Sequence, residues 1–159
     1  MKLFNNNNLT NDNDKTILLE QYKTFVESAD KISDRRINVN TFFITLNSAL
    51  VTVMTIFFSN TVLLLLLTIL GVIFSALWFF NLKNYKQINK CKFHIIQKIE
   101  KKLPINLYKM EWDILTKSTK KYLPVSKLEM FLPFIFIISY TIFITYLLVN
   151  KVQISIIIK

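Results

Sequence analysis

Two stretches of this chain carry no charged side chain, and they constrain its fold more than any other feature. The first runs over 46 residues from Ile37 to Leu82, and the second over 21 residues from Met130 to Asn150. A helix needs about 20 apolar residues to cross a bilayer, so these lengths predict a hairpin of two spans followed by a third span. The sequence therefore predicts an all-α integral membrane protein with three transmembrane helices.

The two stretches divide the chain into six predicted segments. The hairpin is expected to turn at Ser59-Asn60-Thr61, and the helix after the second span is expected to stop before Pro104. The predicted segments are a disordered polar tail (1–14), a cytoplasmic amphipathic helix that continues into the first span (15–39), a transmembrane hairpin (40–81), a basic cytoplasmic helical region (82–129), a third transmembrane helix (130–149) and an external tail (150–159).

The distribution of positive charge predicts the orientation in the membrane. Between Leu82 and Glu129 the chain has 12 lysines and four acidic residues, a net charge of +8. The whole sequence has a net charge of +10. Lysine-rich loops stay on the cytoplasmic side, so the N-terminus and this loop are predicted to be cytoplasmic and the C-terminus external. Anionic lipids are the expected partners of this charge, and nucleic acid is not expected to bind. The residues predicted to lie at the membrane surface are Lys83, Lys86, Lys90 and Trp78.

Few residues of this chain are suited to catalysis or to metal binding. Cys91 is the single cysteine and His94 the single histidine, and two ligands do not make a zinc site. The sequence has no nucleophile-and-base pair and no glycine-rich phosphate loop. We therefore expect no enzymatic activity, no bound metal and no cofactor.

A repeat of seven residues begins before the first span and continues through it. Steps of four and three from Leu18 to Phe57 meet eleven apolar residues among twelve, with Arg36 as the exception. The same steps from Glu20 to Ser59 meet twelve polar residues. An offset of two residues is about 200° around a helix, so the two stripes lie on opposite faces. The pattern predicts one helix from about Lys15 to Ser59 with coiled-coil-like packing.

The polar stripe becomes a row of hydroxyl side chains inside the predicted span. The row consists of Thr41, Thr45, Ser48, Thr52, Thr55 and Ser59. Small hydroxyl residues allow helices to pack closely, which is one interpretation. The other is an aqueous lumen, lined by this stripe when several copies gather around an axis.

Other residues of the repeat and of the spans are predicted to hold helices or subunits together. Asn47 lies off the hydroxyl stripe and is expected to bond to a neighbouring helix, because an unpaired amide is costly in lipid. Gly71 and Ser75 form a small-xxx-small pair that predicts contact between the first two spans. The full set of predicted packing or oligomer residues is Tyr22, Phe25, Ile32, Arg36, Asn47, Gly71 and Ser75.

Several short motifs resemble one bacterial family. They include Glu20-Gln21-Tyr22-Lys23, Leu46-Asn47-Ser48-Ala49-Leu50, Gln87-Ile88-Asn89, Glu111-Trp112 and Tyr122-Leu123-Pro124. Over about Lys15 to Tyr146 the chain is similar to the RipA family of octameric membrane proteins, with lysine at basic positions where that family has arginine. The resemblance implies a homo-octamer in the bacterial cytoplasmic membrane.

Three functions remain open from the sequence. The leading hypothesis is a homo-oligomeric ring that acts as a pore or channel-like assembly, with the hydroxyl stripe as its lining. The second is a structural or scaffolding membrane oligomer that conducts nothing. A looser likeness to SLATT-type small membrane effectors implies a third, a membrane-perturbing effector of a bacterial defence system.

Overall fold

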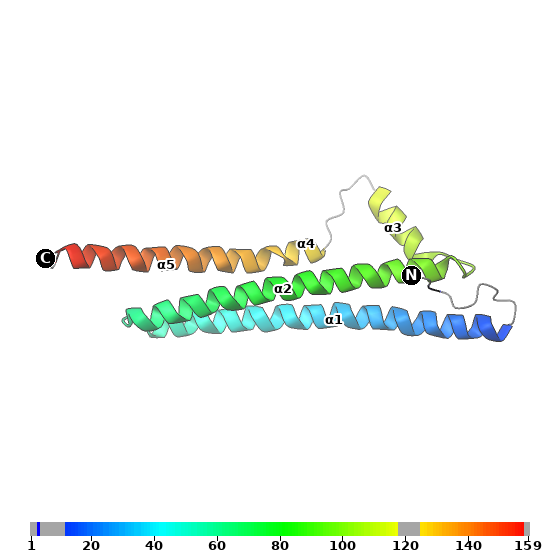
Figure 1. Cartoon of the computed structure of the whole chain (residues 1–159), viewed down its shortest axis with the longest axis horizontal. Helices are drawn as coiled ribbons and strands as arrows, with labels where there is room; N and C mark the ends of the chain where they lie inside the picture. Colours follow the sequence, from blue (N-terminus) through cyan, green and yellow to red (C-terminus); the bar gives the residue numbers. More distant parts are fainter. Residues whose placement is uncertain (1–2, 4–11, 118–124, 158–159) are drawn as a thin grey trace. The chain divides into compact units, whose positions relative to one another are not determined.

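The computed structural model describes residues 3, 12–117 and 125–157, and all elements in these ranges are helices (Figure 1). In chain order they are α1 (Asp12–Ile56), α2 (Thr61–Glu100), α3 (Leu107–Lys117), α4 (Val125–Glu129) and α5 (Phe131–Ile157). Among the described residues, three helical stretches are long and apolar enough to cross a membrane, in α1, in α2 and over Val125–Val149. The predicted fold class, all-α with three spanning helices, is confirmed.

The helix ends differ from the predicted ends by a few residues. α1 begins at Asp12 rather than Lys15, because Asp12 and Asp14 lie in its first turn, where carboxylates favour helix formation, and Lys15 pairs with Asp12 at 2.8 Å. It ends at Ile56, so Ser59 lies in the turn rather than on the helix. Most of the predicted 1–14 tail lies outside the described residues.

The turn between α1 and α2 is capped where the sequence predicts the hairpin to break. The side-chain oxygen of Asn60 accepts a hydrogen bond of 3.1 Å from the backbone N–H of Leu63. Asparagine is among the preferred residues for this N-cap position, since it satisfies one of the free donors at a helix start. The helix that follows runs without interruption from Thr61 to Glu100, so it continues 18 residues past Leu82, the end of the first uncharged stretch.

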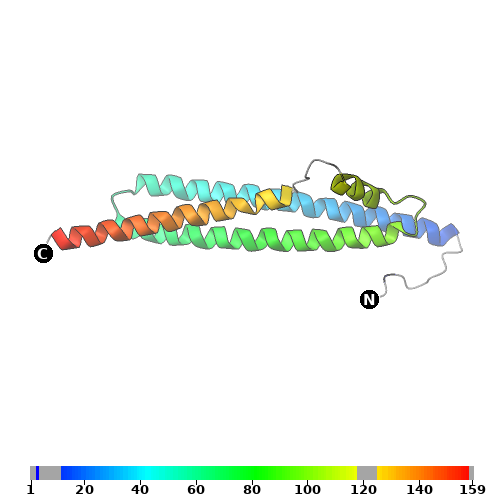
Figure 2. The ribbon, with the colours of Figure 1, turned by 90° about the horizontal axis from the view of Figure 1, so that it is seen from above.

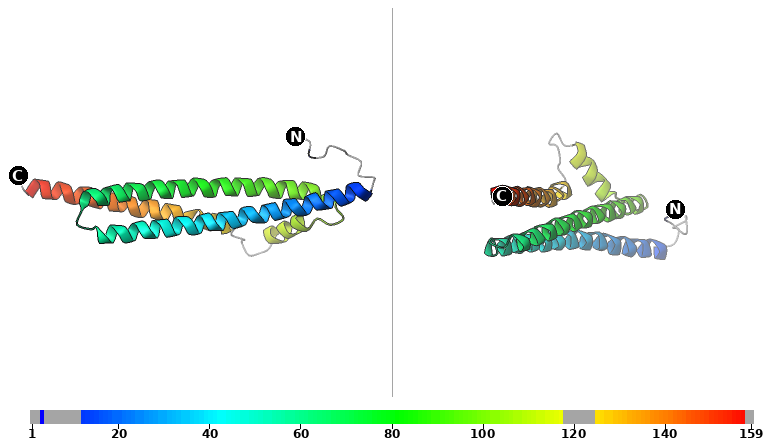
Figure 3. Two further views of the ribbon diagram at one scale, coloured as in Figure 1. Left: turned by 90° about the horizontal axis from the view of Figure 1, so that it is seen from below. Right: turned by 60° about the vertical axis from the view of Figure 1, so that its left-hand side comes forward.

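The chain forms two compact units. One, which we call the α3 unit, consists of residues 1–34 and 88–122, and the other, the spanning unit, consists of 35–87 and 123–159. In the α3 unit, Leu18, Ala29, Ile96 and Ile99 are buried. The ring of Phe93 on α2 lies 5.7 Å from the ring of Tyr108 at the start of α3. From this contact α3 runs at an angle to the end of α2 (Figure 3).

The spanning unit packs three helices around aromatic side chains. Phe43 stacks on Trp78 with ring centroids 6.0 Å apart, and Phe136 of α5 approaches the same indole at 6.1 Å. A second cluster joins Met54, Leu64 and Tyr140, so α5 lies beside both other helices (Figure 2). The buried face of α1 here carries Phe43 and Leu50, both on the apolar stripe.

The third span begins with a break rather than a smooth helix. α4 ends at Glu129, Met130 is in a turn, and α5 starts at Phe131. Pro133 is buried in the first turn of α5 and has no N–H to donate to the carbonyl of Glu129, which explains the interruption. α5 continues to Ile157, well past the predicted end at residue 149, since no proline or glycine interrupts the segment.

Candidate functional site

The centre of the spanning unit holds a polar cluster built around Asn47. This side chain has no exposed surface. Its amide nitrogen donates to the carbonyl of Phe43 at 2.8 Å. Its oxygen accepts from the hydroxyl of Ser75 on α2 at 3.2 Å and from that of Tyr140 on α5 at 3.1 Å. One amide therefore ties all three spanning helices together, which gives it the neighbouring-helix partners that lipid cannot supply.

Gly71 makes the position of Tyr140 possible. A Cβ atom at residue 71 would lie between 2.5 and 2.8 Å from three carbons of the Tyr140 ring. The contact of this glycine is therefore with α5, whereas the sequence analysis expected the small pair to mark contact with the first span. Ser75 does contact that span, through Asn47, and it also donates to the carbonyl of Gly71 at 2.8 Å.

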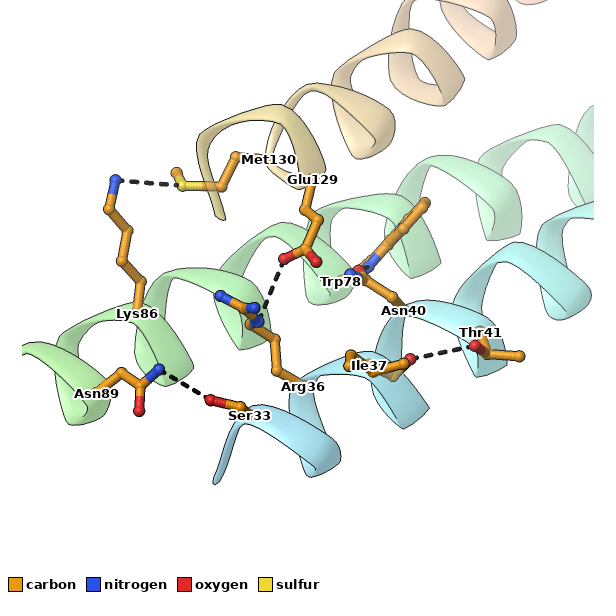
Figure 4. A network of polar contacts seen from close by, with 10 residues as sticks. All are labelled: Ser33, Arg36, Ile37, Asn40, Thr41, Trp78, Lys86, Asn89, Glu129 and Met130. Carbon is orange, nitrogen blue, oxygen red and sulfur yellow. Dashed lines mark hydrogen bonds and ion pairs between the residues drawn. The ribbon is translucent and has the colours of Figure 1, made fainter. Parts of the chain in front are cut away.

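Arg36 and Glu129, the residues directly before the two uncharged stretches, form an ion pair. Nε of Arg36 lies 3.2 Å from a carboxylate oxygen of Glu129, and each side chain is only 15% exposed (Figure 4). Arg36 is the last charge before Ile37, and Glu129 is the last before Met130. The pair explains why a charged residue interrupts the apolar stripe of α1, since its partner comes from the start of the third span.

Trp78 of α2 contacts α1 one turn beyond Arg36, at Asn40. The sequence places this indole at the membrane surface, but it has no exposed surface. Its N–H donates to the side-chain oxygen of Asn40 at 2.8 Å (Figure 4). Its ring contacts those of Phe43 and Phe136. A tryptophan with a satisfied N–H can be buried as well as interfacial, so its occurrence near a span end does not distinguish the two.

The hydroxyl stripe lies on the outside of the subunit. All six of its residues are exposed, while the opposite face of α1 is the buried one. Thr41 donates to the carbonyl of Ile37, Thr52 to that of Ser48, and Thr55 to that of Thr52, at 2.7–3.2 Å. Each of these hydroxyls is thereby satisfied as a donor by its own helix and keeps lone pairs that can accept a further hydrogen bond.

The α3 unit contains a buried carboxylate that caps α3. Glu100 has no exposed surface, and its two oxygens accept the backbone N–H groups of Tyr108 at 2.9 Å and Lys109 at 3.3 Å. These donors belong to the first turn of α3, where no intrahelical acceptor exists. The hydroxyl of Tyr22 on α1 donates to the same carboxylate at 3.1 Å, so Glu100 connects three helices of the unit.

The environment of Glu100 also affects the tyrosine that contacts it. Burial, followed by the hydrogen bond to Glu100, raises the pKa of Tyr22 to about 12. Because this value exceeds the value of about 10 for an unfolded chain, the stabilising contribution of the neutral hydroxyl is complete below about pH 10. It is lost as the pH rises through the folded-state pKa. At neutral pH Tyr22 is a constant donor.

Removing the Glu100 carboxylate should loosen α3. Hydrogen bonds to a charged acceptor contribute about 1.5–3 kcal/mol each, so Glu100→Ala should speed amide exchange at Tyr108 and Lys109 roughly 10- to 100-fold. Hydrogen–deuterium exchange of the purified protein measures this directly. The matched control is Glu111→Ala, an exposed carboxylate on α3 itself. Equal exchange in both variants would show that Glu100 does not hold the helix.

The other sequence-predicted residues are placed apart from these clusters. Phe25 and Ile32 are half-buried in the α3 unit, where the ammonium of Lys92 lies 4.7 Å from the centre of the Phe25 ring. Lys83, Lys86 and Lys90 are exposed. Cys91 and His94 are also exposed.

Comparison with known proteins identifies the family. The model of the octameric membrane protein family (8xMP) matches residues 19–149, which is most of the chain. The chain belongs to this family. The resemblance seen in the sequence motifs is thus confirmed, and self-association in a membrane follows from it. No curated protein and no solved structure matches the chain.

Within an octameric membrane protein, the polar clusters and the outward stripe have different roles. Asn47 and the Asn40–Trp78 pair are hydrogen-bonded inside one subunit, and Arg36 and Glu129 form an ion pair there. The hydroxyl stripe is the polar feature of the first span that one subunit leaves uncovered among its described residues. It is therefore the candidate functional surface of the assembly.

Asn40 and Tyr140 are not among the residues predicted from the sequence, although one pattern points to Asn40. Asn40, Asn47 and Met54 are spaced by seven residues beside the apolar stripe, and all three are buried. Two amides at the same heptad position inside an uncharged span indicate a buried polar seam. Tyr140 has no such pattern around it, because its role depends on which helix packs against Gly71.

Proposed function

We propose that this octameric membrane protein forms a ring whose axis is lined by the hydroxyl face of α1, giving a pore or channel-like assembly. The observation that carries the proposal is the exposure of the five stripe residues of α1, on the face opposite to the packed one. A helix that buries one face within its subunit and keeps the other polar has two natural surroundings for the polar face, a neighbouring helix or water.

The outward faces of the other spans support the choice of α1. α2 exposes Leu66, Ile73 and Leu77, and α5 exposes Ile135, Ile138 and Ile142. These aliphatic surfaces suit contact with lipid chains. α5 also exposes hydroxyls at residues 139, 141 and 145, but their spacing of two and four does not align them in one stripe.

The back-bonded hydroxyls are compatible with a wet lining. Their own helix accepts their protons, so the lone pairs of Thr41, Thr52 and Thr55 remain as acceptors along the stripe. A row of acceptors about one helical turn apart, roughly 5.4 Å, can hydrate water or a cation without a charged side chain.

We further propose that the assembly lies in the bacterial inner membrane with the α3 unit and the N-terminus in the cytoplasm. The excess of lysine between the second and third spans supports this orientation. The exposed Lys83, Lys86 and Lys90 follow the second span directly and are placed to contact anionic lipid head groups.

A triple substitution inside the stripe tests the lining. In proteoliposomes, Thr45→Leu, Ser48→Leu and Thr52→Leu together should abolish ion or small-solute flux, because three apolar rings per assembly would dewet the lumen. The matched control replaces the three exposed hydroxyls of α5, with Ser139→Leu, Thr141→Leu and Thr145→Leu. The control should conduct like the wild type. If the stripe lines a lumen, native mass spectrometry should find both variants octameric.

A non-conducting scaffold is the second candidate, and one observation favours it. Back-bonded hydroxyls present little bulk, which allows two helices to approach closely in a membrane. In that case the stripe is covered by a neighbouring helix. The stripe variant would then lose its octameric mass, and flux would be absent from the wild type as well.

A further inference from the structure

Apolar residues flank the hydroxyl stripe on both sides of α1. On one side they are Ile44, Val51 and Phe58, and on the other Phe42, Ala49 and Ile56, each set spaced by seven residues. We call these the first and the second shoulder. Both are exposed in the subunit, and Ile56 is 70% exposed. If the stripe faces an axis, the two shoulders face the neighbouring subunits on either side.

The first shoulder is bounded by a groove. This groove has a volume of about 210 Å³ between α1 and α5. Its apolar walls are Val51 and Met54 of α1, Phe58 of the turn after α1, and Tyr140 and Phe143 of α5. Thr55 and Ser139 contribute its hydroxyls. The second shoulder ends in the exposed side chain of Ile56, so a protruding residue on one side of the stripe corresponds to a groove on the other.

We propose that Ile56 of one subunit inserts into this groove of the next subunit and closes the ring. The inference rests on the proposed function, because it takes the hydroxyl stripe as the axial face. A cyclic ring requires two different surfaces that fit each other on adjacent copies. A protruding isoleucine and an apolar groove on opposite sides of one stripe are such a pair.

The level of the two features along α1 agrees with rotation about a ring axis. Rotation about an axis that runs along the helix keeps each residue at its own height. The groove extends over Val51 to Phe58, and Ile56 lies within that interval. Phe42 and Ala49, the other residues of the second shoulder, precede Val51 in α1, so they lie at a different height along the helix from the groove.

The fit of Ile56 in the groove also provides close packing, on which helix association in a bilayer depends. Between helices in lipid there is no hydrophobic driving force, and association depends on close packing of complementary shapes. A branched side chain that fills a preformed groove gains this contact, whereas the same side chain on a flat surface exchanges lipid contacts for equivalent protein contacts. A second copy of the chain is the occupant we assign, since the family is octameric.

Disulfide crosslinking tests the contact. In a Cys91→Ser background, which removes the exposed native thiol, Ile56→Cys is combined with either Val51→Cys or Phe143→Cys and oxidised in membranes. At least one double variant should give a ladder of bands up to eight subunits. A variant with only one of the two cysteines should form no crosslink, because residue 56 of one subunit contacts a different residue of the next subunit. Co-expressed single variants should give dimers and nothing longer.

The control pair is Ile73→Cys with Ile138→Cys, on exposed aliphatic faces of α2 and α5. It should give no ladder. Dimers from Ile56→Cys alone would indicate a two-fold contact and overturn the proposal. So would the absence of crosslinks in protein of octameric mass, which would leave the groove to a lipid chain. A ladder of crosslinked bands without ion flux would contradict the conducting lumen and support the contact between Ile56 and the groove. Ion flux without a ladder would support the lumen and contradict that contact.

Discussion

Substitution of Gly71 with alanine should destabilise the spanning unit by about 1–3 kcal/mol, and substitution with valine should prevent the folded octamer from accumulating. The new Cβ would lie 2.5–2.8 Å from the Tyr140 ring, closer than atoms can pack. The ring cannot simply turn aside, because it is 3% exposed and its hydroxyl is bonded to Asn47. Making room for the methyl group therefore separates α5 from the polar cluster as well.

The midpoint of unfolding by SDS in mixed micelles measures the alanine variant, and native mass spectrometry measures the valine variant. The informative control is a double variant. Tyr140→Leu alone should destabilise the unit by opening a cavity, but combined with Gly71→Ala it should cost less than the sum of the two. Additive losses would mean that Gly71 does not act through this ring. Tyr140→Phe isolates the hydroxyl, whose loss should cost about 0.6–1.7 kcal/mol.

Helical periodicity explains why the faces of α1 could be predicted from the sequence. The apolar stripe contains Leu18, Phe43 and Leu50, all buried, and the polar stripe opposite is exposed. Side-chain direction in a helix is set by 3.6 residues per turn, so it does not depend on the tertiary contacts. The same argument gives Asn47 a partner, because an amide inside a bilayer needs one.

The identity of the partners could not be predicted in the same way. Ser75 is 28 residues from Asn47 and Tyr140 is 93 residues away, and no spacing rule links them. Gly71 indicates a close approach but not which helix approaches. The spacing of Ser126 and Glu129 fits a capping box, yet the Glu129 carboxylate pairs with Arg36. Local patterns identify residues that need a contact, and the packing of separate helices decides which contact they make.

The Arg36–Glu129 pair gives the second large expected effect. Each side chain is 15% exposed, so removing one partner leaves a charge that is largely excluded from water. Breaking such a pair usually costs about 3–5 kcal/mol. Arg36→Met or Glu129→Gln alone should therefore lower the SDS unfolding midpoint strongly and reduce the octamer recovered from membranes. Arg36→Lys should also lower it, since an ammonium lacks the planar fork of arginine.

Two further variants separate the pair itself from general effects of charge. Arg35→Met removes the neighbouring exposed arginine and should change stability by less than about 0.5 kcal/mol. The double variant Arg36→Met with Glu129→Leu should be close to the wild type, because it removes both charges and leaves none unpaired. If the double variant were as unstable as the singles combined, the two residues would act independently. The 3.2 Å contact between Arg36 and Glu129 implies that these two charges connect the start of the first span to the start of the third. Independent effects would contradict that connection.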